Sequence, residues 1–120
     1  MAADQSGSVD EVRRAGDGEL CGFVDERDGR WLALSVFGAV LGEHRHEVDA
    51  WDRVLTEGLA SLTERWTLVY GPTAREEVAC ILEANPSQVT VARGYDALPG
   101  VPTLTITAGQ LTSGEWALRR

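Results

Sequence analysis

Lysine is missing from this 120-residue sequence, and all eleven of its basic residues are arginine. The absence excludes a Schiff-base lysine, a lysine that anchors pyridoxal phosphate and the lysine of a P-loop. Cysteine is scarce as well, and Cys21 and Cys80 lie far apart in the sequence. We expect both to be buried free thiols with a structural role, because an intracellular chain with two cysteines seldom depends on a disulfide. The alternative is a redox or catalytic thiol.

The chain also has little positive charge and no long apolar run. Its 19 acidic residues outnumber the 11 basic ones, for a formal net charge of -8, which argues against non-specific binding to nucleic acid or to an anionic membrane. No stretch approaches the roughly 20 apolar residues of a membrane span, and the first segment contains no apolar run able to serve as a signal sequence. We therefore expect a soluble, cytoplasmic protein.

Length and composition predict a single domain. With 43% of its residues apolar, the chain is long enough for one hydrophobic core and too short for two. Residues 1–18 are polar and acidic and contain glycine and serine, so we expect a disordered N-terminal tail there. The single domain is then expected to span residues 19–120.

The clearest periodic pattern predicts an α-helix over residues 48–62. Charges of alternating sign recur on one face, where Arg45, Asp49, Arg53 and Glu57 can pair at four-residue spacing. Apolar residues recur on the opposite face at three- and four-residue steps, so this stripe is expected to be core. The apolar residues are Val48, Trp51, Val54, Leu55, Leu59 and Leu62. Gly58 falls inside the pattern, where it lowers helix stability or marks a close contact.

Strand and helix signals alternate further along the chain. Residues 66–70 are β-branched and aromatic and precede a Gly-Pro pair, which is typical of a short strand. Thr73 and Glu76 have the spacing of a capping box, which predicts a second helix that ends at Asn85. Residues 88–92 alternate as a strand. This order predicts a right-handed parallel crossover.

Other segments complete the predicted fold. Residues 19–26 and 30–37 are expected to form a hairpin, because the Asp-Gly pair between them suits a tight turn. Residues 103–107 alternate as a strand, and residues 113–118 are expected to form a last edge strand. The sum is an α/β fold: a two-layer sandwich with a mixed sheet, an N-terminal hairpin and two helices.

Two histidines are the candidates for metal chemistry. His44 and His46 stand one residue apart with Glu47 and Asp49 beside them, and these are ligand types that Zn, Mn, Fe or Cu accept. On a strand the two imidazoles would share a face and could bind one divalent metal, whereas on a helix they would lie about 200° apart. The alternative is an ordinary first turn of the helix, with His44 near the apolar stripe and His46 exposed among acidic residues.

A family resemblance surrounds these histidines. Residues 38–47 resemble the first cupin motif, in which a glycine and five residues precede a His-x-His pair, and residues 54–58 are similar to its glycine-ended strand. Residues 94–102 faintly resemble the Gly/Pro-rich approach to the second cupin motif. The sequence departs from the family at its glutamate ligand, which would fall near Ala50 or Trp51.

The second-motif histidine of that family would fall on Thr103, so this ligand is also missing. The resemblance therefore implies a small β-barrel that keeps only two of the family's ligands. Its metal would be held by His44 and His46, with Asp49 or Glu47 as the third ligand.

The segment 94–102 is the candidate binding loop by its position after a predicted strand. It displays Tyr95 and Asp96, and Pro99 and Gly100 give it turn chemistry with limited conformational freedom. The alternative is a plain connection between strands. Among the four tryptophans, Trp116 is the candidate for an interface, since the others are expected to be core anchors.

These observations predict a small acidic, non-enzymatic interaction or regulatory domain that binds a protein partner, plausibly a basic one, without a cofactor. The alternative is a cupin-like metal-binding protein or a small metal-dependent enzyme that uses the two histidines. A third alternative is a small-molecule binding fold that uses the loop at Tyr95 and the turn at Gly71.

Overall fold

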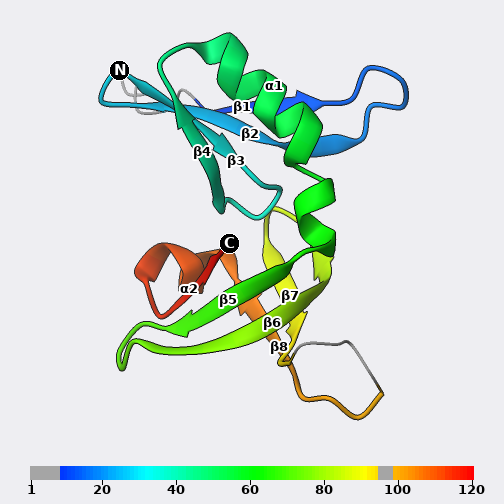
Figure 1. Ribbon diagram of the computed structural model, residues 1–120, viewed down its shortest axis with the longest axis vertical. Coiled ribbons are helices and arrows are strands. Elements are labelled where there is room, and N and C mark those ends of the chain that lie inside the picture. Colours follow the sequence, from blue (N-terminus) through cyan, green and yellow to red (C-terminus); the bar gives the residue numbers. More distant parts are fainter. Residues whose placement is uncertain (1–8, 95–98) are drawn as a thin grey trace. The chain divides into compact units, whose positions relative to one another are not determined.

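The structure, a computed structural model, describes residues 9–94 and 99–120 of the chain. Its contacts divide the chain into two units, Met1–Ser61 and Leu62–Arg120, and each is described by itself (Figure 1). The single domain expected over residues 19–120 stays a prediction.

Unit 1 contains a four-stranded antiparallel sheet with the strand order β1-β2-β3-β4. Asp28 and Gly29 join β2 to β3 with positive φ angles of 52° and 78°, so the predicted N-terminal hairpin is confirmed. The strand β1 lies in the segment expected to be a disordered tail, and its residues pair with β2 instead. The strands are β1 (Val9–Arg13), β2 (Leu20–Arg27), β3 (Arg30–Leu34) and β4 (Val40–His44).

The helix α1 (Glu47–Glu57) packs on this sheet and is followed by a short 3-10 helix, η2 (Ala60–Thr63) (Figure 1). Ala50 and Val54 are its buried residues. The helix approaches the sheet closely because Gly22 of β2 has no side chain: a Cβ there would lie 2.9 Å from Cγ1 of Val54. The predicted helix is thus confirmed over residues 48–57, and its α-helical part ends five residues earlier than predicted.

The predicted core stripe of this helix is right at Val54, which is fully buried, and wrong at Val48 and Leu55. Val48 is 62% exposed and Leu55 is 42% exposed, and Trp51 is half-buried. The buried side is marked by the small residues Ala50 and Val54, and the exposed residues Val48 and Leu55 lie about 100° or more around the helix from both. Close packing against a glycine on the sheet selects the small side chains, so the large ones are left outside.

Because Val54 is buried and Leu55 is exposed, we expect substitutions at these two neighbouring positions to lower the stability by different amounts. Val54→Ala is expected to lower the free energy of unfolding by about 1 to 3 kcal/mol, because Val54 is fully buried. Leu55→Ala should cost less than about 1 kcal/mol, because its side chain already contacts water. Urea unfolding followed by circular dichroism measures both. A larger loss at Leu55 than at Val54 would restore the original stripe as the core face.

Unit 2 contains a five-stranded antiparallel sheet with the order β8-β7-β6-β5-β9, together with the helix α2 (Ala108–Ser113). The strands predicted at residues 66–70, 88–92 and 103–107 are confirmed, as is the final edge strand. Its core contains Trp66, Leu68, Val89, Val91 and Ile106, all at most 1% exposed. The strands are β5 (Arg65–Tyr70), β6 (Arg75–Ala84), β7 (Gln88–Ala92), β8 (Thr103–Thr107) and β9 (Trp116–Arg119).

The helix predicted from Thr73 to Asn85 is wrong, because these residues form a tight turn and the strand β6. Ala74 adopts a positive φ of 57° in that turn and directs the chain back along β5. Glu76 and Glu77, which look like acidic residues at a helix N-terminus, instead pair with arginines on other parts of the sheet. Cross-strand pairing has overridden the local helix signal.

The mixed sheet and its parallel crossover are wrong for the same reason. With β6 as a strand, β5, β6 and β7 form a meander in which every neighbouring pair is antiparallel. The second helix of the fold is α2, where the Thr107 side chain caps the backbone N–H of Gln110 and Gln110 returns the hydrogen bond. The sequence does contain a second capping box, and it lies 34 residues beyond the predicted one.

The α/β class is confirmed: the chain combines two antiparallel sheets with two α-helices. Neither sheet is closed into a barrel within the described residues. Both cysteines are free thiols, with Cys21 buried in β2 and Cys80 half-buried in β6 rather than on a helix. No helix in the described parts of the chain is long and apolar enough to cross a membrane.

Candidate functional site

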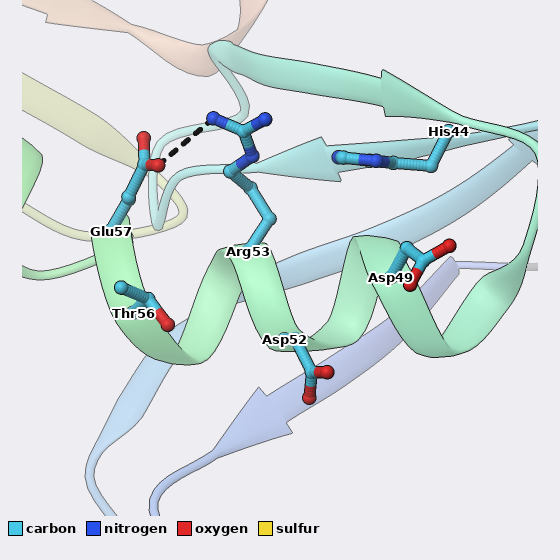
Figure 2. Close-up of a pocket in the computed structure, with 6 residues that line it drawn as sticks. All are labelled: His44, Asp49, Asp52, Arg53, Thr56 and Glu57. Carbon is cyan, nitrogen blue, oxygen red and sulfur yellow. Dashed lines mark hydrogen bonds and ion pairs between the residues drawn. The ribbon is translucent and has the colours of Figure 1, made fainter.

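A pocket of about 400 Å³ lies beside α1 in unit 1 (Figure 2). Helix geometry explains its composition, because Asp49, Asp52 and Thr56 follow one another at three- and four-residue steps and so share one flank of the helix. The strand β4 contributes a histidine to the same pocket. The lining residues are His44, Asp49, Asp52, Arg53, Thr56 and Glu57.

The imidazole of His44 lies over a glycine of its own strand. His44 and Gly42 are two residues apart on β4 and therefore face the same side of the sheet. A Cβ on Gly42 would lie 3.1 Å from Nε2 of His44 and 3.2 Å from Nε of Arg53, so the glycine makes room for both groups. Figure 2 shows the two side chains pointing toward one another beside α1. Nε2 is buried and has no hydrogen-bond partner among the described residues.

Carboxylates dominate the charge of this pocket. Arg53 donates a hydrogen bond of 2.9 Å from Nη1 to Glu57 Oε2, which confirms one of the four-residue ion pairs predicted along this helix. Asp49 and Asp52 form no ion pair with any described residue. The lining thus contains three carboxylates and one guanidinium, a balance that favours cations and hydrogen-bond donors.

The candidate metal ligands do not converge. His44 ends β4 and lines the pocket, whereas His46 is the exposed N-cap residue of α1 and lies outside the pocket lining. Glu47 is exposed in the first turn of α1, and only Asp49 shares the pocket with His44. Within residues 9–94 and 99–120, no group of three or more His, Cys, Asp and Glu side chains is placed to hold a metal ion. Metal binding by these residues stays a prediction.

The candidate loop is only partly described. Tyr95 and Asp96 lie outside the described residues, while Pro99 and Gly100 are exposed in a turn. Trp116 is half-buried on β9, and its ring centroid lies 4.9 Å from that of Tyr70 on the neighbouring strand. Trp116 is thus part of an aromatic pair within unit 2.

Arg93, which directly follows β7, contacts both Trp116 of this pair and Glu77 of β6. Its guanidinium carbon lies 5.8 Å from the centre of the Trp116 ring, within the range of a cation–π contact. Two hydrogen bonds, of 3.1 and 2.6 Å, join Arg93 to the carboxylate of Glu77. These bonds lower the pKa of Glu77 and raise the pKa of Arg93. The positive charge of Arg93 in this cluster is therefore neutralised by the carboxylate of Glu77.

The lowered pKa of Glu77 predicts a pH-dependent contribution to stability. Glu77→Gln should cost about 1 kcal/mol at pH 7, because the bidentate pair is then lost. That difference is expected to persist above the ordinary carboxyl pKa of about 4.5 and to shrink as the pH falls further toward the lower folded-state pKa. Urea unfolding of both proteins from pH 7 to pH 3 measures it. Glu83→Gln, at an exposed carboxylate of the same strand, is the matched control and should have a small effect on stability.

An apolar stripe that is exposed at both of its ends lies next to the pocket on α1. Val48, Trp51 and Leu55 follow at three- and four-residue steps and form the stripe, and a hollow of about 270 Å³ lies beside Glu47, Val48 and Trp51. This surface was not predicted from the sequence, because the same residues were expected to be core. The four-residue repeat of small residues at 50, 54 and 58 is the signal that identifies the other side as the packed one.

The fold and the site together define an α/β protein with a polar pocket and an apolar helix stripe side by side. Comparisons with protein-family models, curated proteins and solved structures gave no match. The cupin resemblance therefore stays a prediction. Residues 54–58, expected to be a strand under that resemblance, belong to α1 and its C-cap.

Proposed function

We propose that this chain is a non-enzymatic binding protein that docks a basic protein segment on α1. The stripe formed by the exposed side chains of Val48 and Leu55 and the half-buried Trp51 carries the proposal. Val48 and Leu55 account for two of the five most exposed large apolar side chains in the described residues, and they lie on one helix face with a tryptophan between them. Single exposed apolar residues are ordinary, but a contiguous helical stripe is typical of a docking surface.

The residue types of the stripe fit an interface. Tryptophan is enriched among the residues that dominate binding energy, and Trp51 lies at the centre of this stripe. A partner that covers Val48 and Leu55 would remove their apolar surface from water. Each Å² of apolar surface buried in this way stabilises the complex by about 25 cal/mol. An apolar face on the partner is therefore required.

The charges around the stripe define the rest of the partner's chemistry. Glu47 and Asp52 border the stripe on its two sides, and the whole chain carries a net charge of -8. A basic partner would be steered toward this surface, and an acidic one repelled. A segment that combines apolar residues with arginine or lysine satisfies both requirements.

The test is selection of a displayed library of random 16-residue peptides against the purified protein. Selected peptides should combine apolar with basic residues, and Trp51→Ala should weaken their binding about 30-fold, the equivalent of about 2 kcal/mol. Val40→Ser is the matched control, since Val40 is 54% exposed in unit 1 but lies on β4. Amide chemical shifts of the labelled protein would locate the bound peptide.

Two results would overturn this proposal. One is a set of selected peptides whose binding responds equally to Trp51→Ala and Val40→Ser. The other is a set whose shift changes fall outside α1. Peptides without basic residues would contradict the predicted partner chemistry, since the acidic border would then play no part in recognition.

A further inference from the structure

We propose that β8 is a self-association surface, where the β8 strand of a second copy of this chain pairs with the edge of the sheet in unit 2. This surface is separate from the docking stripe on α1, because it lies on another element and is recognised through backbone groups. The two sheets of the described residues end in four edge strands, β1, β4, β8 and β9, and β8 differs from the other three.

Three of these edges carry features that hinder pairing with another strand. The strand β1 contains Asp10, Glu11 and Arg13, and its register with β2 is irregular at one end. The strand β4 contains Glu43, and its register with β3 is also irregular. The strand β9 has only four residues and ends at Arg119. Charges, short length and irregular pairing are features with which natural proteins protect their sheet edges.

The strand β8 has none of these features. Its five residues are threonine, leucine and isoleucine, and they pair with β7 in an uninterrupted register. Isoleucine and threonine are β-branched and favour strands. The strand also lies within residues 97–114, the longest stretch of the sequence without a charged residue. A regular, uncharged edge strand of this kind is a template for a further strand.

The hydrogen bonds to β7 show which backbone groups of β8 point away from the sheet. On one side of β8, the N–H of Arg93 donates to the C=O of Pro102, and on the other the N–H of Ala108 donates to the C=O of Ser87, both at 2.8 Å. Such bonds recur at every second residue of an antiparallel strand. The even-numbered residues of β8 therefore bond to β7, and the odd-numbered residues direct their N–H and C=O groups outward.

Thr103 and Thr105 thus form the open part of this edge. The N–H of Thr107, at the end of the strand, donates to Oε1 of Gln110 at 2.9 Å and is already satisfied. Thr103 and Thr105 are exposed, and no residue in the described parts of the chain pairs with their outward backbone groups. An added strand would find a donor and an acceptor at each of these threonines.

Charge favours a second copy of this chain as the added strand. With a net charge of -8, two copies repel one another unless they meet at a surface without acidic side chains. The uncharged β8 provides that surface. The basic segment proposed for α1 would find no carboxylate on β8 to pair with, whereas an uncharged strand matches it.

The sequence of β8 is complementary to itself when two copies pair antiparallel around Leu104. In this register, Thr103 lies opposite the partner's Thr105, and each exchanges N–H and C=O hydrogen bonds with the other. The half-buried Leu104 lies opposite the partner's Leu104, where side chains approach most closely. The threonine pairs extend a row that already exists, since Oγ1 of Thr105 lies 2.9 Å from Oγ1 of Thr90 on β7.

Sedimentation velocity over about a hundredfold range of protein concentration tests the self-association. A contact between two five-residue strands is smaller than the roughly 1,200 Å² of a stable interface, so we expect a reversible dimer at high concentration. The association should stop at the dimer, because the two-fold pairing uses the β8 edge of both copies. A monomer at every concentration, or continued growth beyond the dimer, would overturn this pairing.

Amide hydrogen exchange of the full chain locates the contact. Thr103 and Thr105 should exchange rapidly in the monomer and become protected in the dimer. Leu104 and Ile106 should be protected in both states, because their N–H groups bond to β7. A dimer in which the amides of Thr103 and Thr105 stay unprotected would place the contact elsewhere and overturn the proposal.

Charged variants test the register. Thr103→Glu with Thr105→Glu should weaken dimerisation at least tenfold, because like charges then lie directly opposite one another. Thr103→Arg with Thr105→Arg should weaken it for the same reason, and an equal mixture of the two variants should restore the dimer. Thr73→Glu with Ala117→Glu adds the same two charges at exposed positions of unit 2 outside β8, so it should have a much smaller effect.

The remaining outcomes separate this surface from the α1 stripe and from foreign strands. Val48→Ser with Leu55→Ser should abolish binding of the selected peptides and leave the dimer intact, so each proposal can fail alone. Equal losses in the two pairs of glutamate variants, or no restoration on mixing, would overturn the β8 pairing. Selected peptides that protect Thr103 and Thr105 in a protein that stays monomeric would assign the edge to a foreign strand and overturn the second copy.

Discussion

Gly58→Ala is expected to destabilise the protein by about 3 kcal/mol or more. Gly58 directly follows α1 with a right-handed helical φ of -53°, so its backbone conformation suits alanine as well as glycine. The cost is steric. A Cβ at this position would overlap the carbonyl oxygen of Cys21 on β2 and lie 2.6 Å from the carbonyl oxygen of Val54. Both obstacles are backbone atoms, which cannot rotate away as a side chain could.

Gly109→Ala is the matched control for this experiment. Gly109 lies in α2, where the nearest atom to an added Cβ is Oγ1 of Thr107 at 3.8 Å. Alanine has the higher helix propensity, so this substitution should stabilise by about 0.5 to 1 kcal/mol. Urea unfolding of both variants gives the comparison. If Gly58→Ala were as stable as the parent protein, the close approach of α1 to β2 would be contradicted.

Gly58 illustrates which features of unit 1 could be predicted from the local sequence pattern. Periodicity identified α1 and offered two explanations for the glycine, a weak point in the helix or a close contact, and the structure supports the contact. Periodicity also identified an apolar stripe but could not decide whether it was buried. That decision depends on Gly22 and Val54, which lie on different elements and come together only in the fold.

The error in unit 2 has a different physical origin. The capping-box spacing of Thr73 and Glu76 is a true local preference, and a strand replaced it through partners that are distant in the sequence. Glu76 pairs with Arg119, which follows it by 43 residues, and Glu77 pairs with Arg93, 16 residues later. By contrast, apolar and polar residues alternate along residues 103–107, and the burial of their side chains alternates in the same way around Ile106. The local sequence pattern was therefore enough to predict this strand.

Two of the residues that line the pocket, His44 and Asp49, were predicted as site residues, but as ligands of a metal. His44 was identified as a metal ligand beside His46, whereas the structure brings it to Asp49 and away from His46. The four-residue pairing of Arg53 with Glu57 was predictable from helix spacing alone. The approach of β4 to α1 was not, because β4 itself was missing from the predicted fold.

Trp66→Ala is expected to cause the second large loss, about 3 to 5 kcal/mol. Trp66 on β5 is 1% exposed and is the largest fully buried side chain of the described residues. The substitution removes an aromatic ring that lies opposite Ala79 on the neighbouring strand β6. With alanine at both positions, neither side chain can fill the space. The loss combines apolar surface that is no longer buried with the cavity that remains.

Leu82→Ala provides the matched control on the same sheet. Leu82 belongs to β6 but is 44% exposed, so its truncation should cost less than about 1 kcal/mol. Chemical denaturation followed by far-ultraviolet circular dichroism compares the variants without relying on tryptophan fluorescence, which Trp66→Ala would change directly. Equal losses at the two positions would mean that Trp66 is not the core anchor of this sheet. A loss of several kcal/mol in the free energy of unfolding at Trp66 alone would show that this buried side chain stabilises unit 2, whereas the exposed side chain of Leu82 does not.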